Sequence, residues 1–284
     1  MNLIFVIGCG DVGLRVARLW QARGAAVSAL ARSEDSAARL AAAGIEAVPG
    51  DLDTPASLAA LPVNGATVYY FAPPPLQGDG DPRMRAFVAA GLRPERVVYI
   101  STSGVYGDRA GAWVDEGTAP APGTDRARRR LDAETALRAW GRENGVKVNI
   151  LRVGGIYGPG RWPLERLQAG TPVLREEECG YTNRIHADDL AAICVAAAEH
   201  GGADRIYNVS DGRNGTMTEY FNAVADRFGL PRPPAITMAE AQQRLSPAML
   251  SYLTESRRMD NRRMLQELGV TLRYPMLADG LKEV

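Results

Sequence analysis

A glycine-rich segment near the start of the chain limits the fold more than any other feature. Gly8, Gly10 and Gly13 directly follow the apolar run Leu3–Ile7 and open a segment of helical periodicity. Gly8 permits a tight turn from strand to helix, Gly10 lets the backbone approach a ligand, and Gly13 lets helix and strand pack closely. The free N–H groups and positive dipole of the helix start attract phosphate. The segment therefore predicts a dinucleotide diphosphate site lined by Gly8, Cys9, Gly10, Asp11, Val12 and Gly13.

Short apolar runs alternate with helical segments through the first half of the chain, which is typical of βαβ units on a parallel sheet. Strands are predicted at Leu3–Ile7, Ala26–Ala31, Ile45–Val48, Thr67–Phe71, Arg96–Ser101, Lys147–Val153 and, later, Arg205–Val209. Helices are predicted at Val12–Arg23, Asp35–Ala43, Pro82–Ala90, Arg126–Asn144 and Asp188–Ala198. The predicted fold class is α/β, a Rossmann-type doubly wound parallel sheet with a smaller C-terminal substrate lobe.

The pattern changes after Gly154, where Gly- and Pro-rich turns become frequent. We expect an NAD(P)-binding domain over residues 1–155, completed by about residues 184–210. Residues 156–183 and 211–284 are then expected to form the smaller, substrate-binding lobe. A chain of 284 residues is long enough for one large core with such a lobe.

Composition narrows the class of partner. The formal net charge is +0 and the pI about 6.8, so no global positive field would gather nucleic acid or anionic membrane. The apolar run at the N-terminus is too short for a signal-peptide core, and no other stretch is apolar for about 18 residues. We expect a small-molecule substrate and neither nucleic acid nor membrane as partner, and we leave a homodimer open.

The cysteines and histidines point to a reducing compartment without a metal site. Cys9, Cys179 and Cys194 are odd in number and lack C-x-x-C spacing, so we expect a cytoplasmic protein. Cys9 could have a lowered thiol pKa at the helix start, but we interpret it as a space-filling residue. His186 and His200 have no second histidine or cysteine at ligand spacing, which predicts no metal, and His186 is interpreted as a structural residue.

The end of the second predicted strand bears on the choice of coenzyme. An NAD site carries an acid there for the ribose 2′-hydroxyl. Here Arg32 and Ser33 follow the strand, and the first carboxylate is Glu34. A guanidinium suits a 2′-phosphate, and a serine hydroxyl is a neutral donor beside it. We therefore predict NADP, with NAD as the alternative if Arg32 is only a solvated residue at the helix entry.

Six segments, in a fixed order, give the chain a family resemblance. They are the glycine loop, Gly50–Asp53, Tyr99–Gly107, Leu151–Arg161, Arg184–Leu190 and Tyr207–Gly212. In these segments the chain resembles an atypical extended short-chain dehydrogenase/reductase of the NAD-dependent epimerase/dehydratase type, the nucleoside-diphosphate-sugar epimerases. The resemblance covers nearly the whole chain and implies a Rossmann fold and an NAD(P) coenzyme.

The resemblance also implies roles for particular residues. Asp51 and Leu52 would flank the adenine, although Asp51 could equally be a turn-capping carboxylate. Thr102 would be the family's catalytic Ser/Thr, and Ser101 before it is assigned to the coenzyme site. The coenzyme cleft would also be lined by Phe71, Ala72 and Pro73.

One departure from the family concerns its catalytic pair, a Tyr and a Lys four residues later. Their positions fall on Arg126 and Arg130, and neither lysine of the chain, Lys147 or Lys282, lies four residues after a tyrosine. A guanidinium stays protonated, so Arg126 cannot exchange a proton as a phenol does. Their spacing puts both arginines on one helical face, where they would suit an anion. The alternatives are a solvated charged turn and, for Arg130, a replacement of lysine at the ribose.

Other hydroxyl groups could supply the missing proton. The candidates are Thr102, Ser103, Tyr106 and Tyr157, of which the two tyrosines are interpreted as packing residues. We favour an NADP-dependent oxidoreductase, epimerase or dehydratase with a non-standard active site, acting on a small anionic or nucleotide-linked carbonyl compound. The alternatives are a catalytically inactive NADP-sensing or scaffold protein, and a fold without a ligand.

Overall fold

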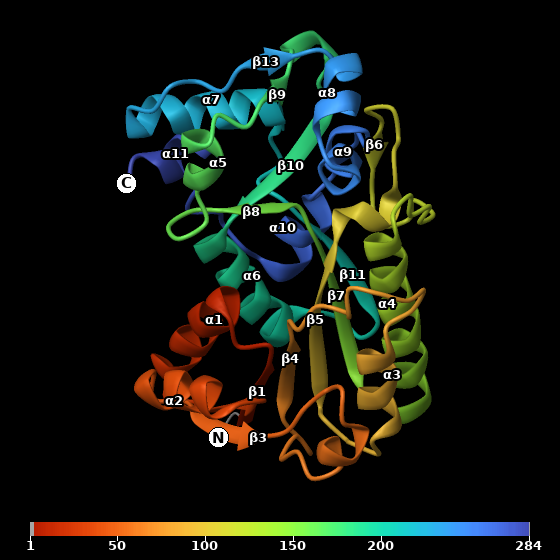
Figure 1. The fold of residues 1–284 in the computed structure, drawn as a ribbon. Helices are drawn as coiled ribbons and strands as arrows, with labels where there is room; N and C mark the ends of the chain where they lie inside the picture. The colour runs from red at the N-terminus through yellow and green to blue at the C-terminus, as the bar shows by residue number, and fades with distance from the viewer. Residues whose placement is uncertain (1–2, 284) are drawn as a thin grey trace.

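A sheet of parallel strands forms the centre of the molecule (Figure 1). The computed structural model describes residues 3–283, apart from the side chains at 247, 248 and 252. Within this range seven strands pair in parallel in the order β11-β7-β5-β4-β1-β2-β3. They are β1 Leu3–Ile7, β2 Ala26–Ala31, β3 Glu46–Pro49, β4 Thr67–Tyr70, β5 Arg96–Thr102, β7 Lys147–Val153 and β11 Arg205–Val209. This confirms the predicted α/β class with a doubly wound parallel sheet.

The strand predictions were accurate to within one residue at each end. β3 lies one residue later than predicted and ends on Pro49, which has no N–H to donate and fits a strand at the sheet's edge. β4 ends at Tyr70 instead of Phe71, because the N–H groups of Phe71 and Ala72 both donate to the Ile7 carbonyl and so leave the ladder. β5 runs one residue further than predicted, to Thr102.

Helices cover both faces of the sheet. Alternate side chains of β1 point to opposite faces: Ile4 and Val6 join the core under α1, α2 and α6, whereas Phe5 and Ile7 join the core under α3 and α4. Because both faces are buried, the central strands read as nearly continuous apolar runs. The five helices are α1 Asp11–Gln21, α2 Glu34–Ala42, α3 Pro82–Ala89, α4 Asp125–Asn144 and α6 Ala187–His200.

Capping side chains decide where these helices begin. The Ser33 side chain accepts from the Ser36 N–H, so α2 begins at Glu34, one residue before the predicted start. His186 Nδ1 accepts from the Asp188 N–H in the same way, so α6 begins at Ala187. The other predicted helices differ from the structure by one or two residues at an end.

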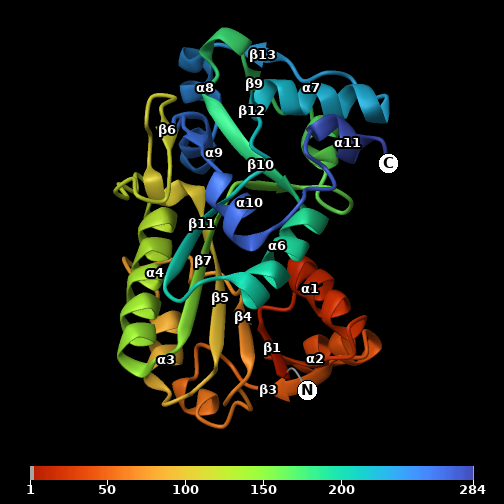
Figure 2. The ribbon, with the colours of Figure 1, turned by 180° about the vertical axis from the view of Figure 1, so that it is seen from behind.

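Shorter elements lie beyond the carboxyl ends of the central strands, as both ribbon views show (Figures 1 and 2). Their strands form one three-stranded and two two-stranded sheets among the described residues: β8 Gly155–Tyr157 with β10 Tyr181–His186 and β12 Asn214–Thr216, β9 Val173–Leu174 with β13 Ala235–Ile236, and β6 Trp113–Val114 with β14 Arg258–Met259. Their helices are α5 Leu164–Gln168, α7 Met217–Phe228, α8 Met238–Arg244, α9 Pro247–Leu253, α10 Arg262–Leu268 and α11 Leu277–Leu281, with short 3-10 turns η2 Ser103–Tyr106 and η3 Glu176–Glu178. A further 3-10 turn, η1 Pro55–Leu58, lies in the connection between β3 and β4.

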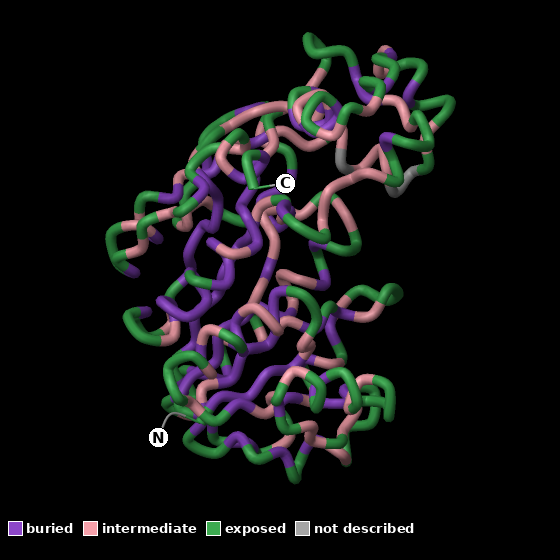
Figure 3. The backbone as a smooth tube through the Cα atoms, turned by 90° about the vertical axis from the view of Figure 1, so that its left-hand side faces the viewer, coloured by how far each residue is buried: buried purple, intermediate pink, exposed green. Residues whose placement is uncertain are grey.

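The pairing of β14 with β6 is a long-range contact that shapes the cleft. Arg258 pairs with Trp113 and Met259 with Val114, which brings the chain near residue 257 back beside the loop after β5. Buried residues concentrate along the central strands, and the outer loops are exposed (Figure 3). No helix in residues 3–283 combines the length and the apolar character needed to cross a membrane.

Candidate functional site

A groove of about 930 Å³ runs across the carboxyl ends of β1, β2 and β4. Ligands of open α/β sheets bind at this edge, where the strand order reverses. Nearly all the residues predicted for the coenzyme lie together along the groove: Gly8, Cys9, Gly10, Asp11, Val12, Gly13, Arg32, Ser33, Asp51, Leu52, Phe71, Ala72 and Pro73. The groove is also lined by Ser36, Arg39, Arg83, Ile100, Arg130, Ile156 and Arg161, among others.

The glycine loop has the shape that a diphosphate requires. Gly8 has a φ of +86°, and a Cβ there would lie 2.4 Å from the Ala72 backbone nitrogen. A Cβ on Gly13 would lie 3.1 Å from the Gly8 carbonyl oxygen, so this glycine lets α1 pack close to β1. A Cβ on Gly10, by contrast, would meet no described atom within 4 Å. Gly10 therefore faces open space on the ligand side of the loop, and the loop fits a coenzyme diphosphate.

The remaining side chains of the loop are compatible with a bound anion. Burial raises the pKa of the Cys9 thiol to about 11, so Cys9 stays protonated and fills space, as interpreted from the sequence. Burial opposes ionisation of Asp11, but hydrogen bonds from Arg161 Nε at 2.5 Å and Arg15 Nε at 3.0 Å outweigh it and lower its pKa. The Asp11 carboxylate is thus neutralised by two guanidinium groups before any phosphate approaches.

Cationic and hydroxyl groups gather where β2 ends. Arg32 and Ser33 follow the strand, and Ser36 and Arg39, in the first and second turns of α2, also line the groove. Ser36 and Arg39 were not singled out from the sequence. Asp51, after β3, also lines the groove, but its Oδ1 accepts from the Asp53 N–H at 3.0 Å, which is the turn-capping alternative.

The arginines that replace the family's catalytic pair both face the cleft. Arg130 lines the coenzyme groove and donates to the Ile100 carbonyl at 2.8 Å and to the Tyr99 hydroxyl at 3.1 Å. Arg126, one turn earlier on α4, lines the cavity next to the groove. Arg129, on another face, is buried and donates to the Gly78 carbonyl at 2.8 Å. The spacing of four therefore places two guanidinium groups at the cleft, as expected from helical periodicity.

Ser101 lies away from the groove lining. Its side chain is buried and donates to Glu134 Oε1 at 2.5 Å. Glu134 in turn pairs with Arg152 at 2.7 Å, with both side chains almost fully buried. Ser101 thus belongs to a polar network between β5, β7 and α4. Any effect of Ser101 on the coenzyme would therefore be indirect, through Glu134 and Arg152.

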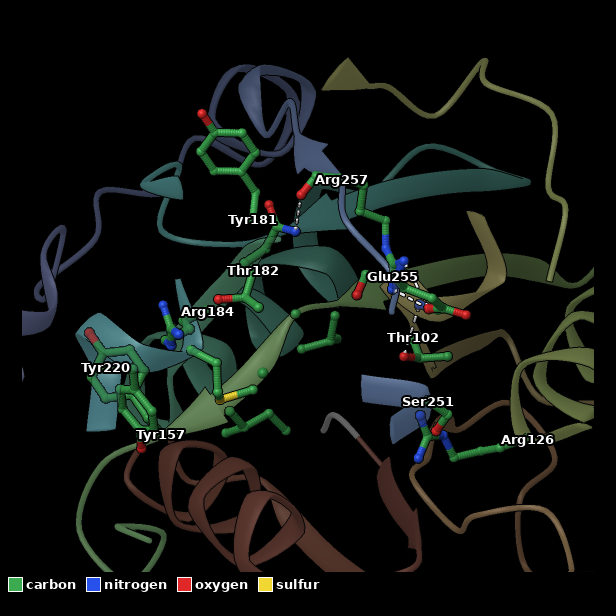
Figure 4. Close-up of a pocket in the computed structure, with 18 of the residues that line it drawn as sticks. Thr102, Arg126, Tyr157, Tyr181, Thr182, Arg184, Tyr220, Ser251, Glu255 and Arg257 are labelled. Atoms are coloured by element: carbon green, nitrogen blue, oxygen red, sulfur yellow. Dashed lines mark hydrogen bonds and ion pairs between the residues drawn. The ribbon is translucent and has the colours of Figure 1, made fainter. Parts of the chain in front are cut away.

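A second cavity of about 410 Å³ adjoins the groove, and Ile156 and Arg161 line both (Figure 4). Thr102, the predicted catalytic hydroxyl, lines it together with Ser103. The Thr102 Oγ1 accepts from the Gly104 N–H at 3.2 Å, which leaves its own O–H available to a ligand. The cavity is also lined by Tyr181, Thr182, Asn183, Arg184, Met217, Tyr220, Ser251, Glu255 and Arg257.

The two tyrosines considered as proton donors differ in their surroundings. Tyr106 is fully buried, and its hydroxyl donates to Asn208 Oδ1 at 2.7 Å, in keeping with a packing role. Tyr157 lines the cavity, but its ring packs against Trp162 and His186, and burial raises its pKa. Neither phenol is tuned to lose its proton near neutral pH.

Several cavity residues were missed from the sequence because they come from the C-terminal half. Glu255 and Arg257 precede β14, and their side chains form an ion pair at 2.8 Å near Thr102 (Figure 4). Arg257 also donates to the Gly107 carbonyl at 2.7 Å. No local motif marks these residues, since only the pairing of β14 with β6 brings them to the cleft. Arg184 was quoted as part of a segment but was assigned no role.

Comparison with known proteins finds relatives that match nearly the whole chain. The chain is similar to protein YeeZ of Escherichia coli, with 25% identity over 292 residues that cover 97% of each protein. A solved structure of a conserved protein of unknown function from Silicibacter pomeroyi has 29% identity and a TM-score of 0.85, covering 99% of this chain and 97% of the other. The alignments to two further curated relatives span only 35% and 45% of those proteins.

Nucleotide-sugar enzymes share the fold. A nucleoside-diphosphate-sugar epimerase from Pseudomonas aeruginosa has a TM-score of 0.81 at 22% identity, covering 99% of this chain and 95% of the other. The model of the NAD(P)H-binding family matches residues 8–201, more than half of the chain. This range includes the glycine loop and the groove residues that follow β2 and β4. The chain therefore belongs to the NAD(P)H-binding family, and its fold is that of the NAD-dependent epimerase/dehydratase type.

Proposed function

We propose that the protein is an NADP(H)-dependent oxidoreductase or epimerase that acts on a small anionic or nucleotide-linked carbonyl compound. The observation that carries the proposal is that the coenzyme groove continues into a second cavity at Ile156 and Arg161. A coenzyme whose diphosphate lies on the Gly8–Gly13 loop would reach that junction with its nicotinamide end. A substrate in the cavity would then lie between this end and Thr102.

The preference for NADP rests on the groups at the end of β2. Arg32 and Arg39 supply guanidinium donors and Ser33 and Ser36 supply hydroxyls along the groove. A 2′-phosphate carries a dianionic charge that such donors bind strongly, and the fork of a guanidinium matches its oxygens. This arrangement favours NADP over NAD.

Arg130 and Thr102 would take the two roles that the family gives to lysine and to its hydroxyl residue. Arg130 is held by the Ile100 carbonyl and would donate to the nicotinamide ribose. When bound, NADPH supplies a hydride. Thr102 would donate a hydrogen bond to the carbonyl oxygen of the substrate, and the positive charge of Arg126 would stabilise the negative charge that develops there. The proton for that oxygen would come from solvent or from a group of the substrate.

The test is binding and turnover with both coenzymes. We expect NADPH to bind more tightly than NADH, and Arg32→Ala to weaken NADPH about tenfold or more with little effect on NADH, since a charge-assisted hydrogen bond contributes about 1.5–3 kcal/mol. Arg18→Ala, on the exposed face of α1, is the matched control. Fluorescence titration of each variant measures the two affinities. Equal affinity of the wild-type protein for both coenzymes would argue against the NADP assignment.

Turnover separates the enzyme from a binding protein. With a panel of sugar nucleotides, keto acids and phosphorylated ketones, we expect NADPH oxidation that falls about 10²–10³-fold in Thr102→Val, the range for loss of a donor to a developing oxyanion. Thr118→Val, in the loop after β6, is the control. NADPH binding without turnover of any compound would favour the alternative, a catalytically inactive NADP-sensing or scaffold protein, for which the Arg126 and Arg130 replacements are the supporting observation.

A further inference from the structure

Arg184 places a positive charge in the wall of the substrate cavity. It lies on β10, opposite Gly155 of β8, and its residue is only 9% exposed. Its guanidinium stacks on the Tyr220 ring, with its central carbon 4.6 Å from the ring centroid. The stacking fixes the plane of the guanidinium beside the cavity, which both residues line (Figure 4).

The partners of Arg184 within the described chain are neutral. Its Nη2 donates to the Thr216 carbonyl at 2.6 Å, and no carboxylate of residues 3–283 forms an ion pair with it. Burial lowers the pKa of Arg184 even though Tyr220, Asp211 and Glu219 oppose the shift from a distance. A buried charge of this kind costs folding free energy unless an opposite charge compensates it.

The other buried arginines of the described chain fall into two groups, those that pair with a carboxylate and those that donate only to neutral oxygens. Arg152 is 3% exposed in its side chain and pairs with Glu134 at 2.7 Å. Arg257, in the same cavity as Arg184, pairs with Glu255 at 2.8 Å. Arg96 and Arg129, by contrast, are buried without a carboxylate partner: Arg96 donates to the Asn149 side-chain oxygen and to backbone carbonyls, and Arg129 donates to the Gly78 carbonyl. Arg184 likewise has no carboxylate partner among the described residues, but unlike Arg96 and Arg129 it lines a cavity that a ligand can enter.

The position of Arg184 separates it from the groups assigned to the reaction. In Figure 4, Arg184, Tyr220 and Tyr157 lie on one side of the cavity, and Thr102 and Arg126 lie on the other. A ligand that spans the cavity would therefore present different groups to the two sides. Neither Arg184 nor Tyr220 lines the coenzyme groove.

We propose that Arg184 is the anion-binding residue of the substrate cavity, so that the substrate carries a carboxylate or phosphate group at the end opposite its carbonyl. The planar fork of the guanidinium matches the two oxygens of either group. The bound anion supplies the counter-charge that the protein itself does not place beside Arg184. This inference rests on the proposed function in one respect only, that the cavity is where the substrate binds.

Anion titration with the coenzyme site filled tests the proposal. Inorganic phosphate and acetate are titrated separately into protein saturated with NADPH, so that the glycine loop and the end of β2 are already occupied, and the melting temperature is followed. We expect at least one of the two anions to raise the melting temperature of the wild-type protein. A response to phosphate alone indicates a phosphorylated substrate, and a response to acetate alone indicates a carboxylate.

Arg184→Met keeps an unbranched, flexible side chain and removes the guanidinium group with its charge. We expect this variant to retain stabilisation by NADPH, because Arg184 lies outside the coenzyme groove, and to bind the anion about tenfold more weakly or not at all. Arg166→Met is the matched control, since Arg166 stacks on the Phe221 ring at 4.5 Å on a neighbouring helix but does not line the cavity. An anion response in Arg184→Met equal to that of wild type overturns the proposal.

Two further outcomes are decisive. If NADPH stabilises the wild-type protein and neither anion does, the anion site is refuted while the coenzyme assignment stands. If NADPH has no effect, the proposed function fails, and the anion response of coenzyme-free Arg184→Met against Arg166→Met still decides the site. Should Arg184→Met not fold, a crystal structure of the wild-type protein with phosphate or acetate decides: an anion on the Arg184 guanidinium supports the proposal, and an anion held only elsewhere overturns it.

Discussion

At the scale of single residues, the glycines of the loop meet different requirements: some are needed by the fold itself, and one leaves open space in the groove. Gly8 is needed by the fold, because its φ is positive and its Cα lies against the backbone of Ala72. Gly10 has no such steric constraint, since a Cβ there would meet no described atom within 4 Å. Gly13 serves packing between α1 and β1.

This difference predicts opposite phenotypes for two alanine variants. Gly8→Ala should lower the free energy of unfolding by about 1–3 kcal/mol or more, since the added Cβ forces strain into the turn. Gly10→Ala should melt close to wild type and lose most of its stabilisation by NADPH, because the Cβ occupies the space of the diphosphate. Thermal melts with and without NADPH measure both. Full NADPH stabilisation of Gly10→Ala would contradict the assignment of the loop.

Asp211 is the second residue after β11. Burial is the main reason why the pKa of its carboxyl group is raised from 3.8 to about 6. Between these two pH values the folded protein binds more protons at this group than the unfolded chain does. The contribution of Asp211 to stability is therefore greatest at low pH and is lost as pH rises through about 6.

Asp211→Asn should remove this loss. Relative to wild type, the variant's free energy of unfolding should be nearly unchanged at low pH and higher by roughly 3 kcal/mol above the folded pKa, from about 1.4 kcal/mol for each pKa unit. Urea unfolding at a series of pH values gives the difference, with Asp79→Asn on an exposed loop as control. A difference that does not grow with pH would show that the carboxyl is not held in a costly ionised state.

At the scale of elements, α4 shows how a cap positions functional side chains. The Thr124 side chain accepts from the Ala127 N–H at 3.2 Å and fixes the start of the helix just before Arg126. From there the helical period alone puts Arg126 at the cavity and Arg130 at the groove. The pair at the cleft is thus a consequence of one cap and a spacing of four.

Thr124→Ala should lower the free energy of unfolding by about 1 kcal/mol, the usual value of an N-cap, whereas Thr124→Ser should be close to neutral. Urea denaturation of the two variants measures this. Since the remaining turns of α4 pack on α3 and β5, Arg130 should stay in place and NADPH affinity should change little. A loss of NADPH binding in Thr124→Ala but not in Thr124→Ser would show that the cap, and not the packing of the later turns, holds Arg130 in place.

At the scale of the whole molecule, the cavity is closed by a segment from near the end of the chain. Asn183 on β10 joins the two parts: its Nδ2 donates to the Arg257 carbonyl at 3.0 Å, and its Oδ1 accepts from the Met259 N–H at 2.8 Å. Both hydrogen bonds are buried and hold the segment that carries Glu255 and Arg257 beside Thr102. The groove for the coenzyme does not depend on them.

Asn183→Ala should therefore affect the two sites differently. We expect a loss of about 2–4 kcal/mol in the free energy of unfolding, because two buried backbone groups lose their partner. Affinity for NADPH should stay near wild type, and binding of anions or substrate in the cavity should weaken. Calorimetric titration of both ligands checks this, with Asn64→Ala, a hydrogen-bonding asparagine in an exposed turn, as control. Equal weakening of both ligands would indicate that groove and cavity form one cooperative unit.

The sequence by itself determined the sheet, its helices and the coenzyme groove, because each depends on local order: an apolar run, a glycine at a fixed position, a cap before a helix. The predicted strands and the groove residues from Gly8 to Pro73 lie on consecutive βα units, so proximity in sequence becomes proximity at the sheet edge. Ser101 differs because its partners, Glu134 and Arg152, come from α4 and β7 and bury it.

Only the tertiary structure decided how the substrate cavity is built. Glu255 and Arg257 reach it through a two-residue pairing of β14 with β6, and Arg184 through a short sheet that β8 and β12 complete. Such contacts join residues far apart in the chain and leave no periodic pattern. The charge balance of the cavity was hidden for the same reason, since whether an arginine is neutralised depends on which carboxylates the fold brings within reach.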